Sequence, residues 1–451
     1  MIGVKRSYGI ITIDEEKCQG CVNCMMSCRT EAIRIFEGKA RIVAARCIYC
    51  GKCFRDCPEN AITSRTHGLE DLKHFKYTIC IPSSTIYSQF PSESAPNRIL
   101  CALKALGFDE VAEEAIGAEE ASIVTQEYLK GYQGPYPLIS SFCPAIIRLI
   151  QIRFPNFVDQ VNPLILPAEI VAKDIRKAKA KELGIKEEEL GIFYLAPCPA
   201  KMVAITKTET KEQSYIDGAI SIAEIYGQLL AALREVSAEE DLRKASGTGI
   251  GWAVKGGEIR ELERQHSLRD DKESIVVDGI KNAINVLDEI ENGRLRNVEF
   301  IEARACPEGC VGGALTVADR YVSRGRIRKL MLSEEKGSAV DRAEVMRRFK
   351  KGYYFFEKGL KPRPFAGRLD PDPIKAVEKM KLRDEIHSSL PGLDCGACGA
   401  PNCRAFADDV VQGRAEVTDC IFKWREGVKN LAREVTQWAE KRPHSLPKRG
   451  K

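Results

Sequence analysis

The spacing of the cysteines constrains this chain more than any other feature of its sequence. Sixteen of its 18 cysteines fall into three groups, and the first group consists of two runs with the spacing Cys-x2-Cys-x2-Cys-x3-Cys. This doubled run is typical of a pair of 4Fe-4S clusters, in which the fourth cysteine of each run binds the cluster of the other run. The expected ligands of one cluster are Cys18, Cys21, Cys24 and Cys57, and those of the other are Cys47, Cys50, Cys53 and Cys28.

Two other uses of cysteine fit this pattern less well. A disulfide framework is typical of short secreted chains, whereas this chain has 451 residues and carries Lys5 and Arg6 at its start with no long apolar core behind them. Zinc sites use Cys-x2-Cys pairs but do not require this four-cysteine run twice. Because we expect no secretory signal and clusters need a reducing compartment, we expect a cytoplasmic protein.

The charge balance argues against nucleic-acid binding. Lys and Arg number 69 and Asp and Glu number 64, so the formal charge of +5 is modest for this length. Nucleic-acid-binding domains instead gather basic residues in one patch. The apolar stretch from Val161 to Ala172 is interrupted by Pro163, Pro167 and Glu169, and a membrane helix needs about 20 consecutive apolar residues. We therefore expect no direct membrane insertion.

The chain divides into three expected domains. Residues 1–68 form a two-cluster ferredoxin-like domain, and residues 74–360 alternate short apolar runs with longer amphipathic stretches, which is typical of an α/β region. The expected strands include residues 77–81 and 192–196, and the expected helices include residues 168–183 and 220–236. A linker follows, marked by Pro362, Pro364, Pro371 and Pro373. Residues 374–451 are expected to form a small helical domain, so the fold class is multidomain, with α+β and α/β parts.

A second group of cysteines lies in the tail. These cysteines are Cys395, Cys398, Cys403 and Cys420, with several glycines around them. Glycine lets the backbone approach a cluster closely. Four thiolates without a nearby histidine allow either zinc or iron and sulfur, and the spacing favours a 4Fe-4S cluster because it differs from the paired Cys-x2-Cys of a zinc ribbon. The segment resembles a small iron–sulfur domain found in some corrinoid and redox-complex subunits.

The third group occupies three separate segments of the middle region. The segments are Ser141-Phe142-Cys143-Pro144, Ala196-Pro197-Cys198-Pro199 and Ala305-Cys306-Pro307-Glu308-Gly309-Cys310. Proline suits the first turn of a helix, so a cysteine before it lies at a helix N-terminus, where the dipole favours a thiolate. We expect these thiolates to hold a fourth cubane between two lobes. The alternative is a set of unrelated buried thiols.

These three segments resemble the signature loops of the iron–iron hydrogenase large subunit, in that family's order. The resemblance implies two lobes of mixed sheet flanked by helices. It also implies an H-cluster, in which a 4Fe-4S cubane joins a di-iron unit that carries CO and cyanide. The implied cubane ligands are Cys143, Cys198, Cys306 and Cys310. Cys310 would bridge to the di-iron unit, and Lys201 matches the lysine that contacts a cyanide.

Several positions depart from the family pattern. The proton-donating cysteine of the family is Phe142 here, and a phenyl ring has no exchangeable proton. A methionine becomes Arg304 and a glycine becomes Glu308, and these two ionisable residues offer either a new proton route or a mutual salt bridge. Further departures are Ala196, Ala204, Ile146 and Leu166. Cys80 offers a thiol from another direction, but for Cys80 and Cys101 a core position is the simpler interpretation.

Two hypotheses about function follow. The first is a divergent, sensory iron–iron hydrogenase with three further 4Fe-4S clusters. It would interconvert dihydrogen with protons and electrons slowly and exchange electrons or signals with a ferredoxin or another protein. The second is a non-catalytic iron–sulfur protein, with only a cubane at this place, that acts in electron transfer or cluster handling. Either protein is compatible with a homo-oligomer.

Overall fold

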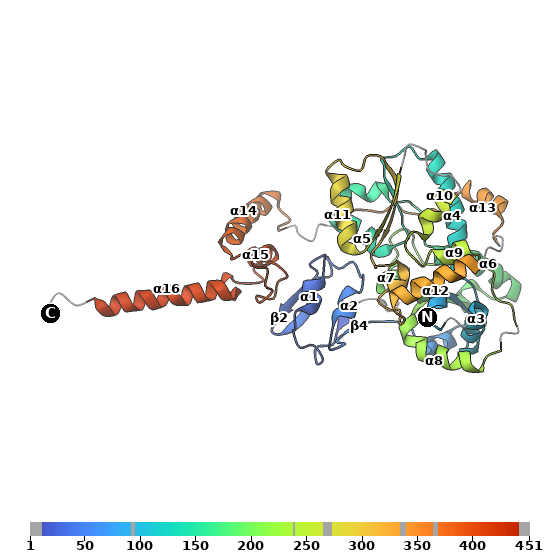
Figure 1. Ribbon diagram of the computed structural model, residues 1–451, viewed down its shortest axis with the longest axis horizontal. Coiled ribbons are helices and arrows are strands. Elements are labelled where there is room, and N and C mark those ends of the chain that lie inside the picture. The colour runs from blue at the N-terminus through green and yellow to red at the C-terminus, as the bar shows by residue number, and fades with distance from the viewer. Residues whose placement is uncertain are drawn as a thin grey trace. The chain divides into compact units, whose positions relative to one another are not determined.

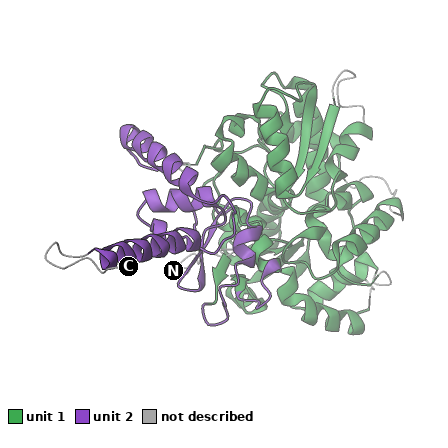
Figure 2. Ribbon diagram, turned by 60° about the vertical axis from the view of Figure 1, so that its left-hand side comes forward, with its two compact units in different colours: residues 1–14, 48–55, 62–363 green, residues 15–47, 56–61, 364–451 purple. Residues whose placement is uncertain are grey.

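A computed structural model describes residues 11–91, 95–237, 240–264, 273–333, 340–363 and 369–441. Its contacts divide the chain into two compact units (Figure 2). Unit 1 comprises Met1–Asp14, Ile48–Arg55 and Ile62–Arg363. Unit 2 comprises Glu15–Cys47, Asp56–Ala61 and Pro364–Lys451. The cysteine runs near the N-terminus therefore contribute residues to both units.

Unit 1 contains two parallel sheets. The first has the strand order β6-β5-β8-β9 and the second the order β10-β11-β7. The strands of the first are β5 (Tyr77–Pro82), β6 (Glu110–Val111), β8 (Leu190–Ala196) and β9 (Gly218–Ser221). Those of the second are β7 (Leu138–Ile139), β10 (Glu273–Asp278) and β11 (Val298–Arg304). The expected strands at residues 77–81 and 192–196 are confirmed. Within the described residues every pairing in these sheets is parallel rather than mixed.

The two central strands are buried along their whole length because they are covered on both faces. Every residue of β8 and of β11 is buried, as expected for parallel strands between helical layers. Helix α6 packs on β5 and β8, while α5 and α11 pack on the second sheet (Figure 1). The expected helices at residues 168–183 and 220–236 are confirmed as α6 (Pro167–Leu183) and α8 (Ile222–Glu235).

The remaining helices of unit 1 connect and cover these sheets. The α-helices are α3 (Pro96–Ala105), α4 (Glu114–Gly131), α5 (Pro144–Arg153), α7 (Pro199–Thr206), α9 (Gly247–Gly251), α10 (Gly257–Arg264), α11 (Ile280–Glu291), α12 (Arg320–Ser333) and α13 (Arg342–Phe349). The 3-10 helices are η1 (Leu69–His74), η2 (Ser84–Ser88), η3 (Pro155–Gln160), η4 (Glu187–Glu189) and η5 (Cys310–Gly312). The short strands β1 (Ile11–Ile13) and β4 (Ile62–Ser64) pair antiparallel.

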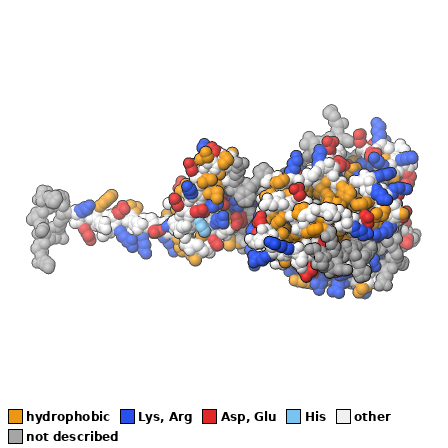
Figure 3. Space-filling model, turned by 90° about the horizontal axis from the view of Figure 1, so that it is seen from above, with side chains coloured by type: hydrophobic (Ala, Val, Ile, Leu, Met, Phe, Trp, Pro, Cys, Tyr) orange, Lys and Arg blue, Asp and Glu red, His pale blue; other side chains and the backbone are white. Residues whose placement is uncertain are grey.

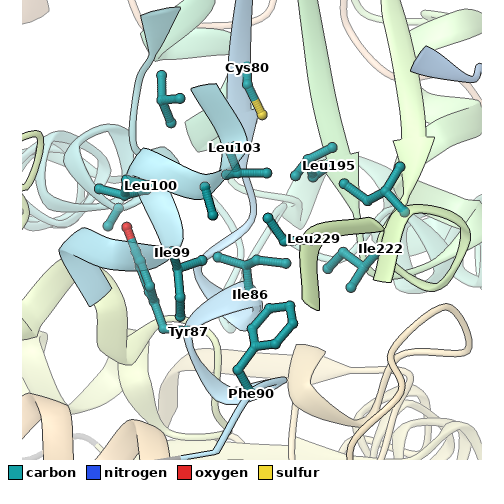
Figure 4. Packing of buried hydrophobic residues seen from close by; sticks show 14 of the residues in the cluster. Cys80, Ile86, Tyr87, Phe90, Ile99, Leu100, Leu103, Leu195, Ile222 and Leu229 are labelled. Atoms are coloured by element: carbon teal, nitrogen blue, oxygen red, sulfur yellow. The ribbon is translucent and has the colours of Figure 1, made fainter. Parts of the chain in front are cut away.

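A large apolar core lies under the first sheet. Cys80 is fully buried there and its side chain points among Leu103 and Leu195 (Figure 4). Burial raises the pKa of the Cys80 thiol well above its ordinary value, so this thiol is a neutral core group. Cys101, in α3, is also buried and its Sγ lies 3.4 Å from the carbonyl oxygen of Glu240. The core interpretation of both cysteines is therefore confirmed.

Unit 2 joins part of the ferredoxin-like segment to the tail. It contains α1 (Asn23–Ser27), β2 (Ile33–Phe36), β3 (Lys39–Ile42), α14 (Pro373–Ser389), α15 (Cys403–Val411), η6 (Val417–Asp419) and α16 (Ile421–Glu440). Helix α2 (Lys52–Asp56) contributes its last residue to this unit. The Ile35 amide donates to the Gly399 carbonyl at 2.9 Å, and the buried side chains of Arg34 and Asp409 form an ion pair. The tail is therefore docked on the β2–β3 hairpin.

The surface carries mixed charge. On the face shown in Figure 3, acidic and basic side chains intermingle, as the near balance of 69 basic and 64 acidic residues suggests. Among the described residues, no helix combines the length and the apolar character needed to cross a membrane.

Candidate iron–sulfur centres

The three signature loops leave the carboxyl ends of parallel strands. The first follows β7 and the third follows β11, and these strands are paired neighbours, with Ile139 opposite Ile301. The second follows β8 of the other sheet. Because ligand sites in open α/β sheets lie outside the carboxyl ends of the strands, the topology accounts for how distant cysteines reach one place.

Two of the loop cysteines begin helices. Cys143 is the N-cap of α5 with Pro144 in the first turn, and Cys198 is the N-cap of α7 with Pro199 in the first turn. The expected cysteine–proline geometry is therefore confirmed for these two loops, whereas Cys306 precedes Pro307 in a turn and begins no helix. The positive end of each helix dipole faces the thiol and favours its ionised form.

The four loop thiols influence one another electrostatically. Burial raises the pKa of Cys198 to about 12, with further increases from Cys310 and Cys143. Burial also raises the pKa of Cys306 well above its ordinary value, and Cys198, Cys143 and Cys310 add to this increase. Four neighbouring thiols in an apolar site resist joint ionisation, whereas a bound metal core would displace their protons. This donor set suits a cluster.

Backbone contacts hold the second and third loops together. The Leu315 amide donates to the Pro197 carbonyl at 2.9 Å, and a Cβ added at Gly313 would collide with that same carbonyl oxygen. At Gly309 the backbone has φ +88°, a conformation that L side chains rarely adopt, and a Cβ there would lie 2.7 Å from the Lys255 nitrogen. Gly313 therefore lets the second and third loops approach, and Gly309 lets the third loop approach the backbone at Lys255.

Phe142 occupies the centre of a cationic and aromatic group. Its ring is 4% exposed and meets the Trp252 ring edge-on at 5.1 Å between centroids. Lys201 Nζ lies 4.0 Å and Arg304 Cζ lies 4.1 Å from the ring centroid. Both contacts are short enough for cation–π attraction. The phenyl ring thus contacts two buried cations but has no proton to donate.

Lys201 is buried and donates two side-chain hydrogen bonds. Its Nζ donates to Glu114 Oε1 at 2.7 Å and to the Tyr194 hydroxyl at 3.0 Å. Burial alone would lower the pKa of Lys201, but the charges of Glu114, Tyr194 and Cys310 raise it well above the ordinary value. Lys201 is therefore a fixed cation near Cys310. Glu114 and Tyr194 were not expected from the sequence, since no local pattern links them to Lys201.

Arg304 is paired, but not with the expected partner. Its guanidinium lies 3.1 Å from Glu302 and 3.4 Å from Glu258, and all three side chains are buried. Burial raises the pKa of Glu258 to about 7, although Arg304 opposes this increase. Ser140 also donates to Glu258 at 2.7 Å. Arg304 Nη1 is buried and, among the described residues, has no hydrogen-bond partner, so it remains available to an anionic ligand.

Glu308 pairs with other cations, so the suggested Arg304–Glu308 salt bridge is wrong. Its carboxylate lies 3.3 Å from Lys255 and 2.8 Å from Arg324. The backbone explains why Glu308 does not pair with Arg304. Glu308 has φ +66°, and its amide donates a hydrogen bond to the Asp278 carboxylate at 2.8 Å. This left-handed backbone turns the side chain toward α12 instead of toward Arg304.

The structure also brings together the first expected set of N-terminal ligands. Burial raises the pKa of Cys24 to about 11, and Cys18, Cys21 and Cys57 raise it further. Cys57 comes from the second run, as the crossed pattern predicts. The amides of Ala40 and Ala61 lie 3.4 Å and 3.3 Å from the sulfurs of Cys18 and Cys57. Such N–H donors stabilise ligating thiolates.

The second N-terminal set divides between the units. Cys28 and Cys47 belong to unit 2, while Cys50 and Cys53 belong to unit 1. Within unit 1, Cys50 adds to the raised pKa of Cys306 and packs in the same apolar cluster as Cys143 and Cys198. Cys50, an expected ligand of the second cluster, therefore lies beside the loop cysteines.

The four tail cysteines surround one cavity. Its lining includes Cys395, Cys398, Cys403 and Cys420. Burial raises the pKa of Cys398, and Cys420 and Cys395 add to the increase. Among the described residues, no three or more His, Cys, Asp or Glu side chains are arranged to hold a single metal ion. A 4Fe-4S core differs from such a site because each thiolate binds a separate iron.

Comparisons with known proteins agree with the loop geometry. Residues 76–314 match the family described as iron only hydrogenase large subunit, C-terminal domain. Residues 10–58 match a 4Fe-4S dicluster domain, and residues 390–422 match a family of Fe-S cluster segments. The chain is an iron–sulfur protein of the oxidoreductase class. It belongs to the iron-only ([FeFe]) hydrogenase large subunit family.

The similar proteins are distant. The NADP-reducing hydrogenase subunit HndD of Solidesulfovibrio fructosivorans is 24% identical over 66% of this chain and 63% of its own length. Iron hydrogenase 1 of Clostridium pasteurianum is 22% identical over 67% of this chain and 64% of its own length. The chain thus spans less than two thirds of each. A solved variant of [FeFe]-hydrogenase HydA1 from Chlamydomonas reinhardtii has a TM-score of 0.47 at 16% identity, covering 63% of this chain and 93% of that one.

Proposed function

We propose that this protein is a divergent, sensory hydrogenase that slowly interconverts dihydrogen with protons and electrons and reports hydrogen or redox state to a partner. The observation that carries the proposal is the meeting of four loop thiols with two buried cations, Lys201 and Arg304. An anionic cluster with anionic ligands needs such partners when it is buried.

The residues present fit an H-cluster. Cys143, Cys198, Cys306 and Cys310 would hold the cubane, with Cys310 as the bridge to the di-iron unit. When bound, this group would supply the hydrogen and electron chemistry. Lys201 beside Cys310 and the unpartnered Nη1 of Arg304 offer hydrogen-bond donors to cyanide or CO.

The chain's own residues orient this site and limit its rate. Glu114 and Tyr194 hold the Lys201 ammonium in one position. Phe142 excludes water beside it but donates no proton. A positioned acid or base contributes about 10²–10⁴-fold to a proton-transfer step, so the loss of a thiol at this position accounts for a slow enzyme.

Electrons would reach the site through the ferredoxin-like segment. Cys50 of the second N-terminal cluster lies beside the cubane cysteines, and the docked tail offers a third 4Fe-4S cluster next to the first. We infer that a ferredoxin or another electron-transfer protein exchanges electrons with one of these three outer clusters.

The second candidate is a non-catalytic iron–sulfur protein with only the cubane. The observation that favours it is Phe142, which packs on both cations and fills the position of the proton donor. Isotope exchange between D2 gas and water, catalysed by anaerobically matured protein, distinguishes the two candidate functions.

We expect slow exchange between D2 and water protons in the wild type, and none in Cys310→Ser, which lacks the bridging thiolate. Iron content controls for cluster loading, with about 18 iron atoms per chain for the full set and about 16 without the di-iron unit. A matured wild type that holds about 16 iron atoms per chain and shows no exchange would establish the second candidate.

A further inference from the structure

Helix α16 carries a regular apolar stripe. Six large apolar side chains repeat at alternating intervals of three and four residues, and each is 40% to 65% exposed. They are Ile421, Trp424, Val428, Leu431, Val435 and Trp438. This spacing is a heptad repeat over 18 residues, with Ile or Val at every a position and Trp or Leu at every d position.

The stripe has no partner within the chain as described. No residue of α16 is buried, and the two tryptophans are 55% and 65% exposed. An isolated helix of 20 residues is marginal in water, since most helical stability comes from packing of an apolar face. An exposed stripe of this size marks an interaction surface.

The width of the stripe selects a helix rather than a lipid surface as its partner. A strict a/d pattern forms the narrow seam of a coiled coil, whereas a helix lying in a membrane interface needs a broader apolar face. Phe422 is the one large apolar residue of α16 outside the a and d positions. The residues that flank the seam include Arg425 and Glu434, which would remain in water.

The flanking residues permit pairing with an identical helix. In a parallel pair, Gly427 of one copy faces Ala432 of the other, and Glu434 faces Ala439. No like charges therefore meet across the seam. In parallel coiled coils, Ile or Val at a together with Leu at d favours two strands; the three a positions and Leu431 match this choice.

The area that such a pair would bury is sufficient. Large aromatic side chains bury about 150–250 Å² each, so four tryptophans that are 55% and 65% exposed contribute roughly 360–600 Å². The eight aliphatic side chains of the two seams bring the total to about 1,000 Å², which is near the lower limit for a specific interface.

We propose that α16 pairs with α16 of a second copy in a parallel two-stranded coiled coil. The pairing is independent of hydrogen chemistry. Because α16 begins one residue after Cys420, it brings the tail cysteines of both copies to the same end of the coiled coil.

Sedimentation velocity on full-length, cluster-loaded protein tests the pairing. We expect the wild type to sediment at twice the chain mass of 50.2 kDa. Leu431→Glu places a charge in the seam and should halve this mass. Asn430→Glu introduces the same side chain one residue away and should leave it unchanged. Both positions are exposed in the single chain, so neither substitution disturbs a buried core.

Three outcomes would overturn the proposal: a wild type that stays at one chain mass, a Leu431→Glu variant that still pairs, or equal disruption by Asn430→Glu. A monomeric wild type that co-sediments with phosphatidylserine vesicles would assign the stripe to a membrane surface instead.

A distance measurement tests the orientation. Glu440 is replaced by a nitroxide-bearing amino acid, and the separation of the two labels is measured with the clusters oxidised. A parallel pair sets the labels side by side, whereas an antiparallel pair sharing the whole seam separates them by about 30 Å along the axis, at about 1.5 Å per residue. The longer separation would contradict the proposal.

Discussion

Phe142 is the residue that most distinguishes this site, because its ring occupies the position where the resemblance implies a proton-donating cysteine. Phe142→Cys should restore a proton donor and raise hydrogen turnover at least tenfold in matured protein, while lowering stability by about 2–4 kcal/mol through lost packing. Methyl viologen-coupled hydrogen oxidation measures the turnover. Phe142→Ala is the matched control, since it opens the same space without a thiol. An equal gain in both variants would show that space, and not the proton, limits the rate.

The Lys201–Glu114 pair is the second feature at this scale. Both side chains are buried and lie 2.7 Å apart, so Lys201→Met should leave Glu114 as a buried unpaired charge. The expected loss is about 3–5 kcal/mol of unfolding free energy. The double variant Lys201→Met/Glu114→Gln should recover most of this loss in denaturant unfolding under anaerobic conditions. Additive losses would contradict a direct ion pair.

Glu120 should make stability depend on pH. It is 7% exposed, accepts a hydrogen bond from the Tyr354 hydroxyl at 2.7 Å, and burial raises its pKa to about 7. An unfolded glutamate has a pKa of about 4.3, so the folded state binds a proton more tightly. Its contribution is present below about pH 4.3 and is lost as the pH rises to about 7, by on the order of 3 kcal/mol.

Glu120→Gln should remove this dependence because an amide does not ionise. We expect its thermal midpoint to exceed that of the wild type at pH 8 and to approach it at pH 5. Parallel pH profiles of the two proteins would show that Glu120 does not titrate in this range.

The sequence predicted that the loop cysteines and Lys201 lie close together, but it did not predict the residues that surround them. Cysteine spacing and the cysteine–proline steps are local signals. Glu114, Tyr194, Glu258 and Trp252 meet Lys201, Arg304 and Phe142 only through tertiary folding. An isolated acidic or aromatic residue in a helix or strand has no neighbouring sequence pattern that predicts such a tertiary contact.

At the scale of elements, the positions of the loops depend on strand order. The strands and helices singled out in advance were found within one or two residues because their apolar patterns are regular. The pairing of β7 with β11 could not be predicted, since β7 has only two residues, Leu138–Ile139. That pairing places the first and third loops at one sheet edge.

The docking of the tail on β2 could not be predicted from the sequence either, because it depends on a buried ion pair between Arg34 and Asp409, which are 375 positions apart.

Asp409→Ala should leave the buried Arg34 without its carboxylate partner and weaken the docking of the tail by about 3–5 kcal/mol. Hydrogen exchange at the Ile35 amide, which donates to Gly399, should accelerate at least tenfold. Asp384→Ala removes an exposed partner of Arg383 and should leave that amide protected. Unchanged exchange in Asp409→Ala would contradict docking through this pair.

At the scale of the whole molecule, the cysteine sets are distributed over elements that the chain brings together from three regions. Both ends of the chain contribute cysteines to unit 2, and the ferredoxin-like segment contributes residues to both units. Sequence order alone suggested three consecutive domains, because contacts between distant segments leave no local signal.

The central claim is that the four loop cysteines hold one cubane and that Cys310 carries a di-iron unit. Infrared spectroscopy of anaerobically matured protein tests it most directly, with Cys310→Ser measured alongside. We expect bands of bound CO and cyanide in the wild type and their loss in the variant. A fully matured wild type without these bands, or a variant that retains them, would contradict the claim.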